Sequence, residues 1–241
     1  MRKRVGIIIF FSIICAPAFL LAGHHNNYLK VVTSDSEGVI LDLRVPRPDI
    51  QEVWEEGTLY HKIAIPGFIP TTDVGSPQLL QHGVLLGIPE EASPTIEILK
   101  AKSTILSGYN IHSAPKPVVI EDGENRSLGF EFALDKKIYS FNDFTPSSIA
   151  KIDFTGFMRG QKVMRVVFFP FQFNPVTGEL RYYSKIRVKI NFNVGIIEQE
   201  TVSVTDKDRK RRSIKEKDNA YEKLLKGVIL NYEQIRRGNY K

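Results

Sequence analysis

The alternation of apolar and polar residues is clearest between residues 159 and 192. Residues 163–173 form an apolar run rich in β-branched and aromatic side chains, and a turn-like segment, residues 174–178, follows it. Pro175 fixes its own φ and Gly178 can adopt a positive φ, so we predict two strands around a tight turn. The second strand has one apolar and one polar face. Its apolar residues are Ile186, Val188, Ile190 and Phe192, which alternate with Lys185, Arg187, Lys189 and Asn191.

Short apolar runs separated by Pro, Gly, Asp and Asn continue this β pattern through most of the chain. We therefore predict an all-β fold, an antiparallel β-sandwich or jelly-roll-like domain over residues 28–197. No regular alternation of strands with helices is visible, which argues against a parallel sheet. The further strands that we predict are residues 39–45, 61–65, 84–88, 95–106 and 129–134.

A helical pattern occupies residues 219–236, which we predict to form one C-terminal amphipathic helix. Its apolar residues recur at three- and four-residue spacing and so line one face. Asn219 and Glu222 have the spacing of a capping box, whereas Gly227 weakens the helix by about 1 kcal/mol. Such a face packs either on the chain's own core or on a partner domain, and the sequence leaves both open. The apolar residues are Tyr221, Leu224, Leu225, Val228, Ile229 and Tyr232.

A charged linker, residues 198–218, separates the β domain from this helix. Its basic residues concentrate in residues 207–217, which include the run from Arg209 to Arg212. A basic run can bind nucleic acid, but acidic residues interrupt this one and it has no aromatic side chains for base stacking. We therefore expect a solvated linker, or one that proteases cut, and no nucleic-acid partner.

The N-terminus has the pattern of a secretory signal peptide over residues 1–23. Residues 2–4 are basic, residues 5–21 are almost all apolar, and small residues follow where a signal peptidase can cut. A membrane anchor is the alternative, because about 17 apolar residues is the lower limit for a span. Pro17 and the small residues favour cleavage. We expect export to the periplasm, the extracellular space or the cell surface, with no membrane partner after cleavage.

Removal of this leader changes both the charge and the cysteine content. The whole chain has 33 basic and 27 acidic residues, a formal charge of +6, and residues 2–4 carry part of that excess. Cys15, the only cysteine, also lies in the leader, and Ile14 before it does not fit a lipoprotein signal. The expected mature domain therefore has no disulfide and no thiol for catalysis, and its hydrophobic core alone must hold it together.

Candidate catalytic and metal-binding groups are sparse. The sequence contains no Ser-His-Asp or Cys-His arrangement, no His-x-x-x-His spacing and no Gly-rich phosphate loop. The adjacent His24 and His25 fit a loose tail better than a metal site. We therefore expect a chain that is not an enzyme and that holds no cofactor or metal. The other histidines, His61, His82 and His112, are scattered.

Several short blocks of sequence, each weak alone, form a specific set between residues 28 and 237. They include an Arg-Gly-Gln block, a Pro-Phe-Gln-Phe-Asn-Pro-Val-Thr turn and a Leu-Arg-Tyr-Tyr block. The blocks are residues 69–80, 111–117, 157–161, 170–177, 180–183 and 221–236. As a set they resemble the propeptide of gingipain-type cysteine peptidases, although Leu80 stands where that family usually has Pro.

The resemblance implies a β-sandwich prodomain that assists the folding of a cysteine endopeptidase and keeps it latent. The implied partner is the cognate catalytic domain, encoded in the same precursor or nearby. Zymogens of the family are cut after the Arg that ends the C-terminal helix, which corresponds to Arg236, with Arg237 as the adjacent alternative. Family propeptides also inhibit through a basic side chain. Arg126, in the expected loop 123–128, is a candidate for that role, and an ordinary exposed arginine is the alternative.

A different class of function remains open. The chain can be a free-standing exported β-sandwich with an adhesive or structural binding role, which has kept the propeptide fold without an enzyme.

Overall fold

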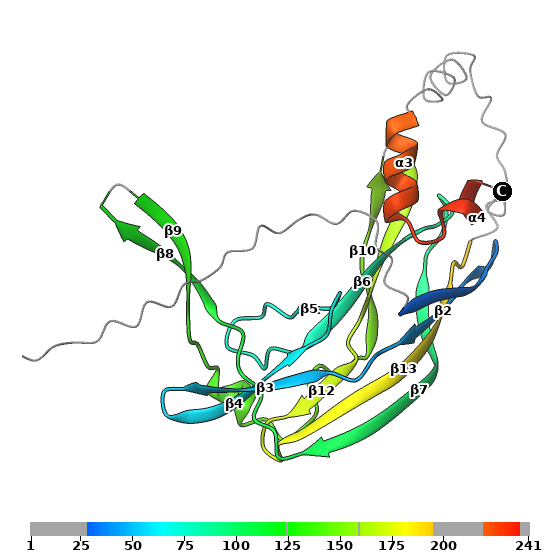
Figure 1. Ribbon diagram of the computed structural model, residues 1–241. Helices are drawn as coiled ribbons and strands as arrows, with labels where there is room; N and C mark the ends of the chain where they lie inside the picture. Colours follow the sequence, from blue (N-terminus) through cyan, green and yellow to red (C-terminus); the bar gives the residue numbers. More distant parts are fainter. Residues whose placement is uncertain (1–27, 124, 159, 195–218, 237–241) are drawn as a thin grey trace, which may run out of the picture.

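Two antiparallel β-sheets pack face to face in the structure (Figure 1). The structure is a computed structural model, and it describes residues 28–123, 125–158, 160–194 and 219–236. The predicted all-β class and antiparallel arrangement are confirmed. The predictions for the leader, residues 1–23, and for the linker, residues 198–218, lie outside the described residues.

The strand β13 (Glu179–Asn191) lies at the centre of the first sheet. One of its edges pairs along the whole strand with β7 (Thr95–Ser107). Its other edge pairs with β12 (Phe171–Asn174) near the start and with β2 (Gly38–Arg44) near the end. On the far side of β2 lies β1 (Leu29–Ser34). The first sheet is therefore organised around one long strand that is paired on both edges.

The second sheet has the order β10-β11-β6-β5. Its central strands are β11 (Gln161–Phe168) and β6 (Leu80–Gly87), and β10 (Ala150–Met158) forms one edge. At the other edge, the short β5 (Ile69–Pro70) pairs only with the start of β6. Most of the outer edge of β6 is therefore left for another segment of the chain.

Two hairpins extend from the sandwich on the same side in Figure 1. One pairs β3 (Asp49–Glu55) with β4 (Thr58–Ala64). The other pairs β8 (Lys116–Asp122) with β9 (Asn125–Glu131), and the one-turn helix α1 (Lys136–Tyr139) follows it.

The hydrophobic core lies between the inner faces of the two sheets. Ile186, Val188 and Ile190 of β13 are fully buried there, as the alternation of the sequence predicts. Met164 and Phe168 of β11 belong to the same cluster. Because successive side chains of a strand point to opposite faces, the basic residues between those of β13 lie on the outer face. Other fully buried members are Val39, Leu41, Leu43, Leu86, Val166, Phe171, Leu180 and Phe192.

The apolar run of residues 163–173 is divided between the two sheets, which corrects the predicted hairpin. The strand β11 ends at Phe168 in the second sheet, and β12 begins at Phe171 in the first. Pro170, which has no backbone N–H and a fixed φ, lies at the crossing. Only the short β12 pairs with β13 around the predicted turn. The run is apolar because almost all of it is buried in one sheet or the other.

The predicted turn at residues 174–178 is present, and Asn174 organises it. The side-chain Oδ1 of Asn174 accepts a hydrogen bond from the backbone N–H of Val176 at 3.0 Å, and its carbonyl accepts one from Gly178 at 3.0 Å. Gly178 has a φ of 67°, and a Cβ there would lie 3.0 Å from the carbonyl oxygen of Tyr109. Glycine is therefore required at this turn for both conformation and space.

The other predicted strands agree with the structure to different degrees. Those expected at residues 39–45, 61–65, 84–88 and 95–106 overlap β2, β4, β6 and β7. The strand expected at 129–134 is displaced, because β9 spans Asn125–Glu131. The sequence pattern does not predict the strands β1, β3, β8 and β10, because they lie at sheet edges or in hairpins. Their side chains are mostly exposed there and lack a clear apolar alternation.

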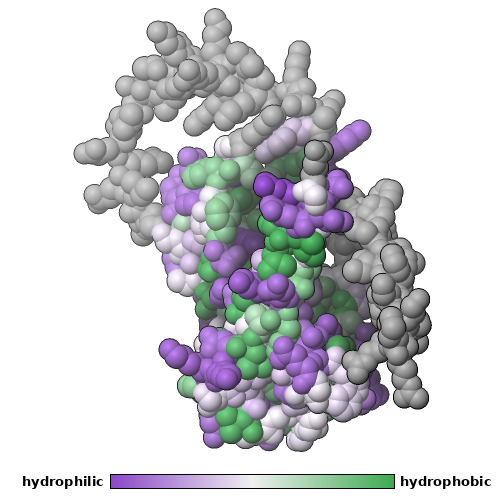
Figure 2. Space-filling model, turned by 90° about the vertical axis from the view of Figure 1, so that its left-hand side faces the viewer, coloured by the Kyte–Doolittle hydropathy of each residue, from purple (hydrophilic) through white to green (hydrophobic). Residues whose placement is uncertain are grey.

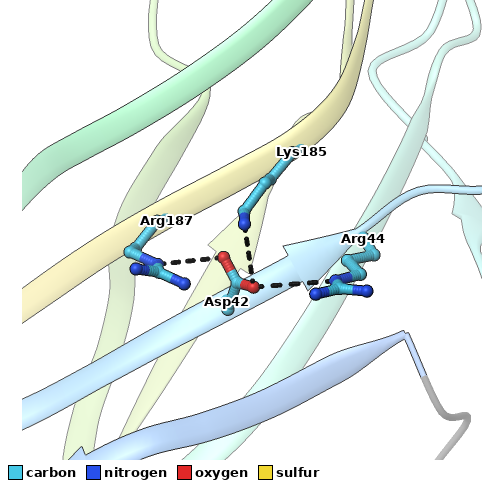
Figure 3. A network of polar contacts seen from close by, with 4 residues as sticks. All are labelled: Asp42, Arg44, Lys185 and Arg187. Atoms are coloured by element: carbon cyan, nitrogen blue, oxygen red, sulfur yellow. Dashed lines mark hydrogen bonds and ion pairs between the residues drawn. The ribbon is translucent and has the colours of Figure 1, made fainter.

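Asp42 of β2 is a buried carboxylate on the outer face of the first sheet, with only 4% of the residue exposed. Three cations surround it (Figure 3). Oδ1 of Asp42 lies 3.1 Å from Nε of Arg187. Oδ2 lies 3.3 Å from Nζ of Lys185 and 3.8 Å from Nε of Arg44. The cluster ties β2 to β13 on the face opposite the core.

The pKa of Asp42 is lowered by this arrangement. Burial alone would raise it, but the hydrogen bonds and charges of Arg187 and Lys185 outweigh burial. The folded pKa therefore lies below the unfolded value of about 3.8. The resulting stabilisation is complete above that unfolded value and is lost as the pH falls through the lower folded value.

We expect Asp42→Asn to reduce the free energy of unfolding at neutral pH by about 1–3 kcal/mol, because a charged hydrogen-bond acceptor is lost. The variant should also lose less stability than the wild type on acidification below pH 4. Urea unfolding from pH 2.5 to 7 measures both effects. Asp73→Asn, at an exposed position, is the matched control. Identical pH dependence in wild type and Asp42→Asn would contradict the assignment.

Candidate functional site

The β8–β9 hairpin projects from the sandwich and carries an exposed apolar face (Figure 1). The exposed fractions are 65% for Val119, 68% for Leu128 and 65% for Phe130. Figure 2 views the molecule from the side on which both hairpins lie, and apolar surface is visible there between hydrophilic patches. Isolated two-stranded hairpins are marginally stable in water, and exposed apolar patches mark interaction sites.

The register of the hairpin places Arg126 on this apolar face. Val119 lies opposite Leu128, and Glu121 lies opposite Arg126 two residues nearer the tip. Since alternate residues share a face, the apolar pair continues directly into the charged pair. Pro117 and Phe130 extend the same face toward the base. The hairpin thus presents an apolar strip that ends in a charged pair beside the tip.

Arg126 and Glu121 form an exposed ion pair, with 3.1 Å between Nε and Oε1. The side chains are 77% and 62% exposed. Exposed pairs of this kind contribute little to stability, so the guanidinium can exchange Glu121 for a carboxylate of a partner at small cost. The structure corrects one detail of the prediction, because Arg126 lies within the strand β9 rather than in a loop over residues 123–128.

Both ends of the hairpin are fastened to the sandwich at Gly75. The backbone N–H of Gly75 donates to the carbonyl of Ala114, just before β8, at 2.9 Å. The carbonyl of Gly75 accepts from the N–H of Asp135, after β9, at 3.0 Å. Gly75 has a φ of 79°, and a Cβ there would lie 2.9 Å from the backbone nitrogen of Asp135. A glycine at this crossing sets the direction in which the hairpin leaves the domain.

The C-terminal strap, residues 219–236, is the second candidate region. It consists of α3 (Asn219–Val228) and α4 (Tyr232–Arg236), where the pattern predicts a single helix. Leu225, Ile229 and Tyr232 pack with Val163 of β11 in a cluster separate from the main core. The strap therefore covers the outer face of the second sheet, so its apolar face packs on the chain's own sheet. The side chain of Asn219, the expected cap, lies outside the described residues.

The break between the two helices has a clear cause in the free edge of β6. The backbone N–H of Leu230 donates to the carbonyl of Leu85 at 2.9 Å. The side chain of Asn231 accepts from the N–H of Gly87 at 2.8 Å and donates to its carbonyl at 2.9 Å. The strap thus pairs with strand groups that β5 does not reach, and buried backbone groups require such partners.

Arg236, the expected processing residue, ends α4. Its Nη1 donates to Oε2 of Glu222 in α3 at 3.1 Å, and Lys226 pairs with Glu233 at 2.7 Å. All four side chains are substantially exposed, so these pairs orient the helices more than they stabilise them. The alternative residue, Arg237, lies outside the described residues.

The histidines are dispersed, and each that the structure describes has a local structural role. The rings of Tyr60 and Phe132 each pack edge-on against His112, which is buried. Nδ1 of His61 lies 3.1 Å from the backbone nitrogen of Asn110 and accepts its hydrogen bond. The described residues contain no group of three or more His, Cys, Asp or Glu side chains able to hold a metal ion. His24 and His25 lie outside them.

Burial lowers the pKa of His82, although a hydrogen bond with the carbonyl of Gly67 acts in the opposite direction. Its ring packs against Phe68.

Among the described helices, none is both long and apolar enough to cross a bilayer.

The exposed apolar face of a hairpin that projects from an antiparallel sandwich marks a site where another protein can bind. The chain belongs to the Propeptide_C25 family, whose sequence profile matches residues 22–239. The predicted resemblance to gingipain propeptides is therefore confirmed. Membership also agrees with the expectation of a non-catalytic pro-region.

Relatives of known name agree with this assignment. Gingipain R2 from Porphyromonas gingivalis W83 is 25% identical over 238 residues, 97% of this chain and 30% of that protein. Lys-gingipain HG66 from the same species is 23% identical over 147 residues, 60% of this chain and 8% of that protein. The chain thus spans less than a third of these relatives.

Two solved structures share the fold. A complex of Porphyromonas gingivalis RgpB pro- and mature domains matches 86% of this chain and 99% of the matched chain, with a TM-score of 0.67 and 21% identity. A structure that addresses zymogenic latency of gingipain K from the same species matches 68% of this chain and 91% of the other, with a TM-score of 0.57 and 18% identity.

The two hydrogen bonds between the side chain of Asn231 and the backbone of Gly87, here called the clasp, yield a testable prediction. Asn231→Ala leaves two buried backbone groups of Gly87 without their partners, at a cost of roughly 2 kcal/mol. We expect the amides of residues 221–236 to exchange with solvent faster while those of β13 keep their protection. Hydrogen exchange with mass spectrometry measures this. Leu224→Ala, at a half-exposed position of α3, is the control. Equal exchange in both variants would refute the clasp.

Proposed function

We propose that this chain is the pro-region of a gingipain-type cysteine endopeptidase, which it binds, assists in folding and keeps latent. The observation that carries the proposal is the β8–β9 hairpin, with its exposed apolar face and Arg126 beside the tip. The family membership supports it, as does the solved complex between pro- and mature domains of RgpB. The partner is a catalytic domain encoded in the same precursor or nearby.

Latency follows from the chemistry of the hairpin tip. A peptidase that cleaves after basic residues needs an acidic specificity pocket, and a guanidinium fits such a pocket through two parallel charge-assisted hydrogen bonds. Arg126 occupies that pocket in our proposal, while Val119 and Leu128 bury their exposed apolar surface against its rim. The loss of the weak pair with Glu121 costs little in comparison.

Arg126→Ala should weaken inhibition of the cognate catalytic domain about 100-fold, because truncation of a desolvated charged anchor costs roughly 2–5 kcal/mol. Arg126→Lys, which keeps the charge without the planar fork, should lie between. Inhibition constants against a fluorogenic peptide measure the effect. Arg47→Ala, at an exposed position outside the hairpin, is the control and should inhibit like the wild type.

Two outcomes separate the parts of this proposal. If the wild-type chain at micromolar excess leaves the peptidase fully active, the latency function is wrong. If the wild type inhibits and Arg126→Ala inhibits equally well, only the role of Arg126 is wrong. The folding role is judged in the same system, by the yield of active peptidase refolded with and without the chain.

Release of the pro-region is proposed to occur by cleavage after Arg236, or after the adjacent Arg237. A scissile segment must adopt an extended conformation in a protease, whereas Arg236 is helical and paired with Glu222. Cleavage there therefore requires α4 to unfold locally.

We expect Arg236→Gln combined with Arg237→Gln to abolish this processing, while Glu222→Gln accelerates it by releasing Arg236. N-terminal sequencing of the liberated catalytic domain locates the cut. A cut at an unchanged position in the double variant would exclude both residues.

The leader, residues 1–23, supports export to the periplasm, the extracellular space or the cell surface.

The DNA beyond codon 241 distinguishes the pro-region from a free-standing adhesive or structural domain. An open frame encoding a His and Cys peptidase is expected for a pro-region. A stop codon without a neighbouring peptidase gene would favour the free-standing domain.

A further inference from the structure

The outer face of the first sheet carries rows of basic side chains. Residues directly opposite each other on neighbouring strands share a face, so the strand register defines each row. Lys30 of β1 lies opposite Asp42 of β2, which lies opposite Arg187 of β13, which lies opposite Lys100 of β7. This first row crosses four strands and contains three cations and one carboxylate.

Two further rows run beside it. In one, Arg44 of β2, Lys185 of β13 and Lys102 of β7 follow one another, and all three are basic. In the other, Ile40 of β2 and Glu97 of β7 flank Lys189 of β13. The three rows together form the basic face.

The basic face has a large excess of positive charge at its surface. Its acidic residues are Asp42 and Glu97, and Asp42 is buried beneath Arg44, Lys185 and Arg187 (Figure 3). The buried carboxylate orients the three cations without presenting its own charge to the solvent. The cations of the face are Lys30, Arg44, Lys100, Lys102, Lys185, Arg187 and Lys189.

The latency function does not account for these charges. The hairpin that carries Arg126 belongs to a separate sheet, and the ion pairs of the strap lie on the second sheet. Lys30, Lys100 and Lys102 are exposed and form no ion pair with the described residues. Four of the seven cations on this face, Lys189 and the three exposed lysines, form no ion pair with the described residues, and this excess of positive charge indicates an anionic partner.

We propose that the basic face docks on the surface of an anionic lipid bilayer. Its cations spread over four strands of an open sheet face, so they suit a broad charged surface rather than one small anion. The rows contain no aromatic side chain on which a base could stack, and a face of four strands is wider than the two-stranded ribbon that the major groove of DNA admits. Each Lys or Arg near an anionic membrane contributes about fivefold to binding.

The position of the face in the chain favours the same partner. Residues 22–28 alone separate the apolar stretch 5–21 from β1, where the basic face begins. A segment of that length spans at most about 25 Å. A domain that folds while the leader is still in the membrane therefore keeps the start of β1, and with it Lys30, near the bilayer. This goes beyond the expectation that membrane contact ends with the leader.

The test compares the full chain with Lys30→Gln/Lys100→Gln/Lys102→Gln. The ion pairs of Asp42 in the described part of the chain are with Arg44, Lys185 and Arg187 and not with these lysines, so the variant should keep the stability of the fold. Sedimentation with phosphatidylcholine vesicles containing about one-third phosphatidylglycerol should show a loss of affinity of roughly 100-fold for the triple variant. Pure phosphatidylcholine vesicles subtract any contribution of the apolar residues 5–21. Added salt should weaken the binding of the wild type, because it screens exposed charges.

Two matched variants control for net charge and for fold. Lys62→Gln/Lys136→Gln/Lys137→Gln removes the same charge from exposed positions outside the first sheet and should bind vesicles like the wild type. Lys30→Arg/Lys100→Arg/Lys102→Arg keeps the charge and should also bind. Thermal unfolding verifies that each variant is folded.

Three results would overturn the proposal. The first is equal binding of the wild type to the two kinds of vesicle. The second is unchanged vesicle affinity of the triple glutamine variant. The third is binding of the wild type to double-stranded DNA without binding to vesicles. Failure of peptidase inhibition by the wild type would bear only on the latency function.

Discussion

Burial of the apolar face of β13 is the interaction on which the rest of the structure depends. Ile186, Val188 and Ile190 are fully removed from solvent, and each such side chain contributes about 1.5–3 kcal/mol. The same strand pairs with β7 on one edge and with β12 and β2 on the other, so its position sets the register of the first sheet. Without a disulfide among the described residues, this burial has no covalent substitute.

The β8–β9 hairpin, the strap and the basic face all lie on parts of the sandwich that the packing of its core leaves exposed or unpaired. The β8–β9 hairpin leaves the domain at Gly75, where one glycine fastens both of its ends. The strap occupies the edge of β6 that the short β5 does not cover. The basic face is the outer side of β13 and its neighbours. A rigid core thus leaves surface hairpins, edges and faces free to vary in function.

Comparison of particular segments shows where sequence patterns are sufficient. The alternation through residues 185–192 predicts both the strand and its buried face, because a period of two requires only that one side of a sheet be covered. The apolar run at 163–173 misleads, since a crossing between two sheets and a single buried strand produce the same composition. Arg126 could be singled out only through the resemblance to a family, because nothing in its immediate sequence distinguishes it from an ordinary exposed arginine.

The strap illustrates the same limit for helices. The helical period through residues 219–236 correctly indicates an apolar face, but not the break between α3 and α4. That break depends on backbone groups of Leu85 and Gly87 that β5 leaves for the strap, and these residues are distant from the strap in sequence. Hydrophobic periodicity records which side chains are buried, and it carries no information about which backbone groups elsewhere need a partner.

The sequence by itself therefore determined the all-β class, the buried face of β13, the turn at residues 174–178 and the family of the chain. Each of these follows from local conformational preference or from a linear pattern of residues. Only the tertiary structure decided the division of residues 163–173 between two sheets, the apolar strip that ends at Arg126 and the gathering of seven cations on one face. Those features depend on strand register, which brings together residues far apart in the chain and is set by the packing of the whole sandwich.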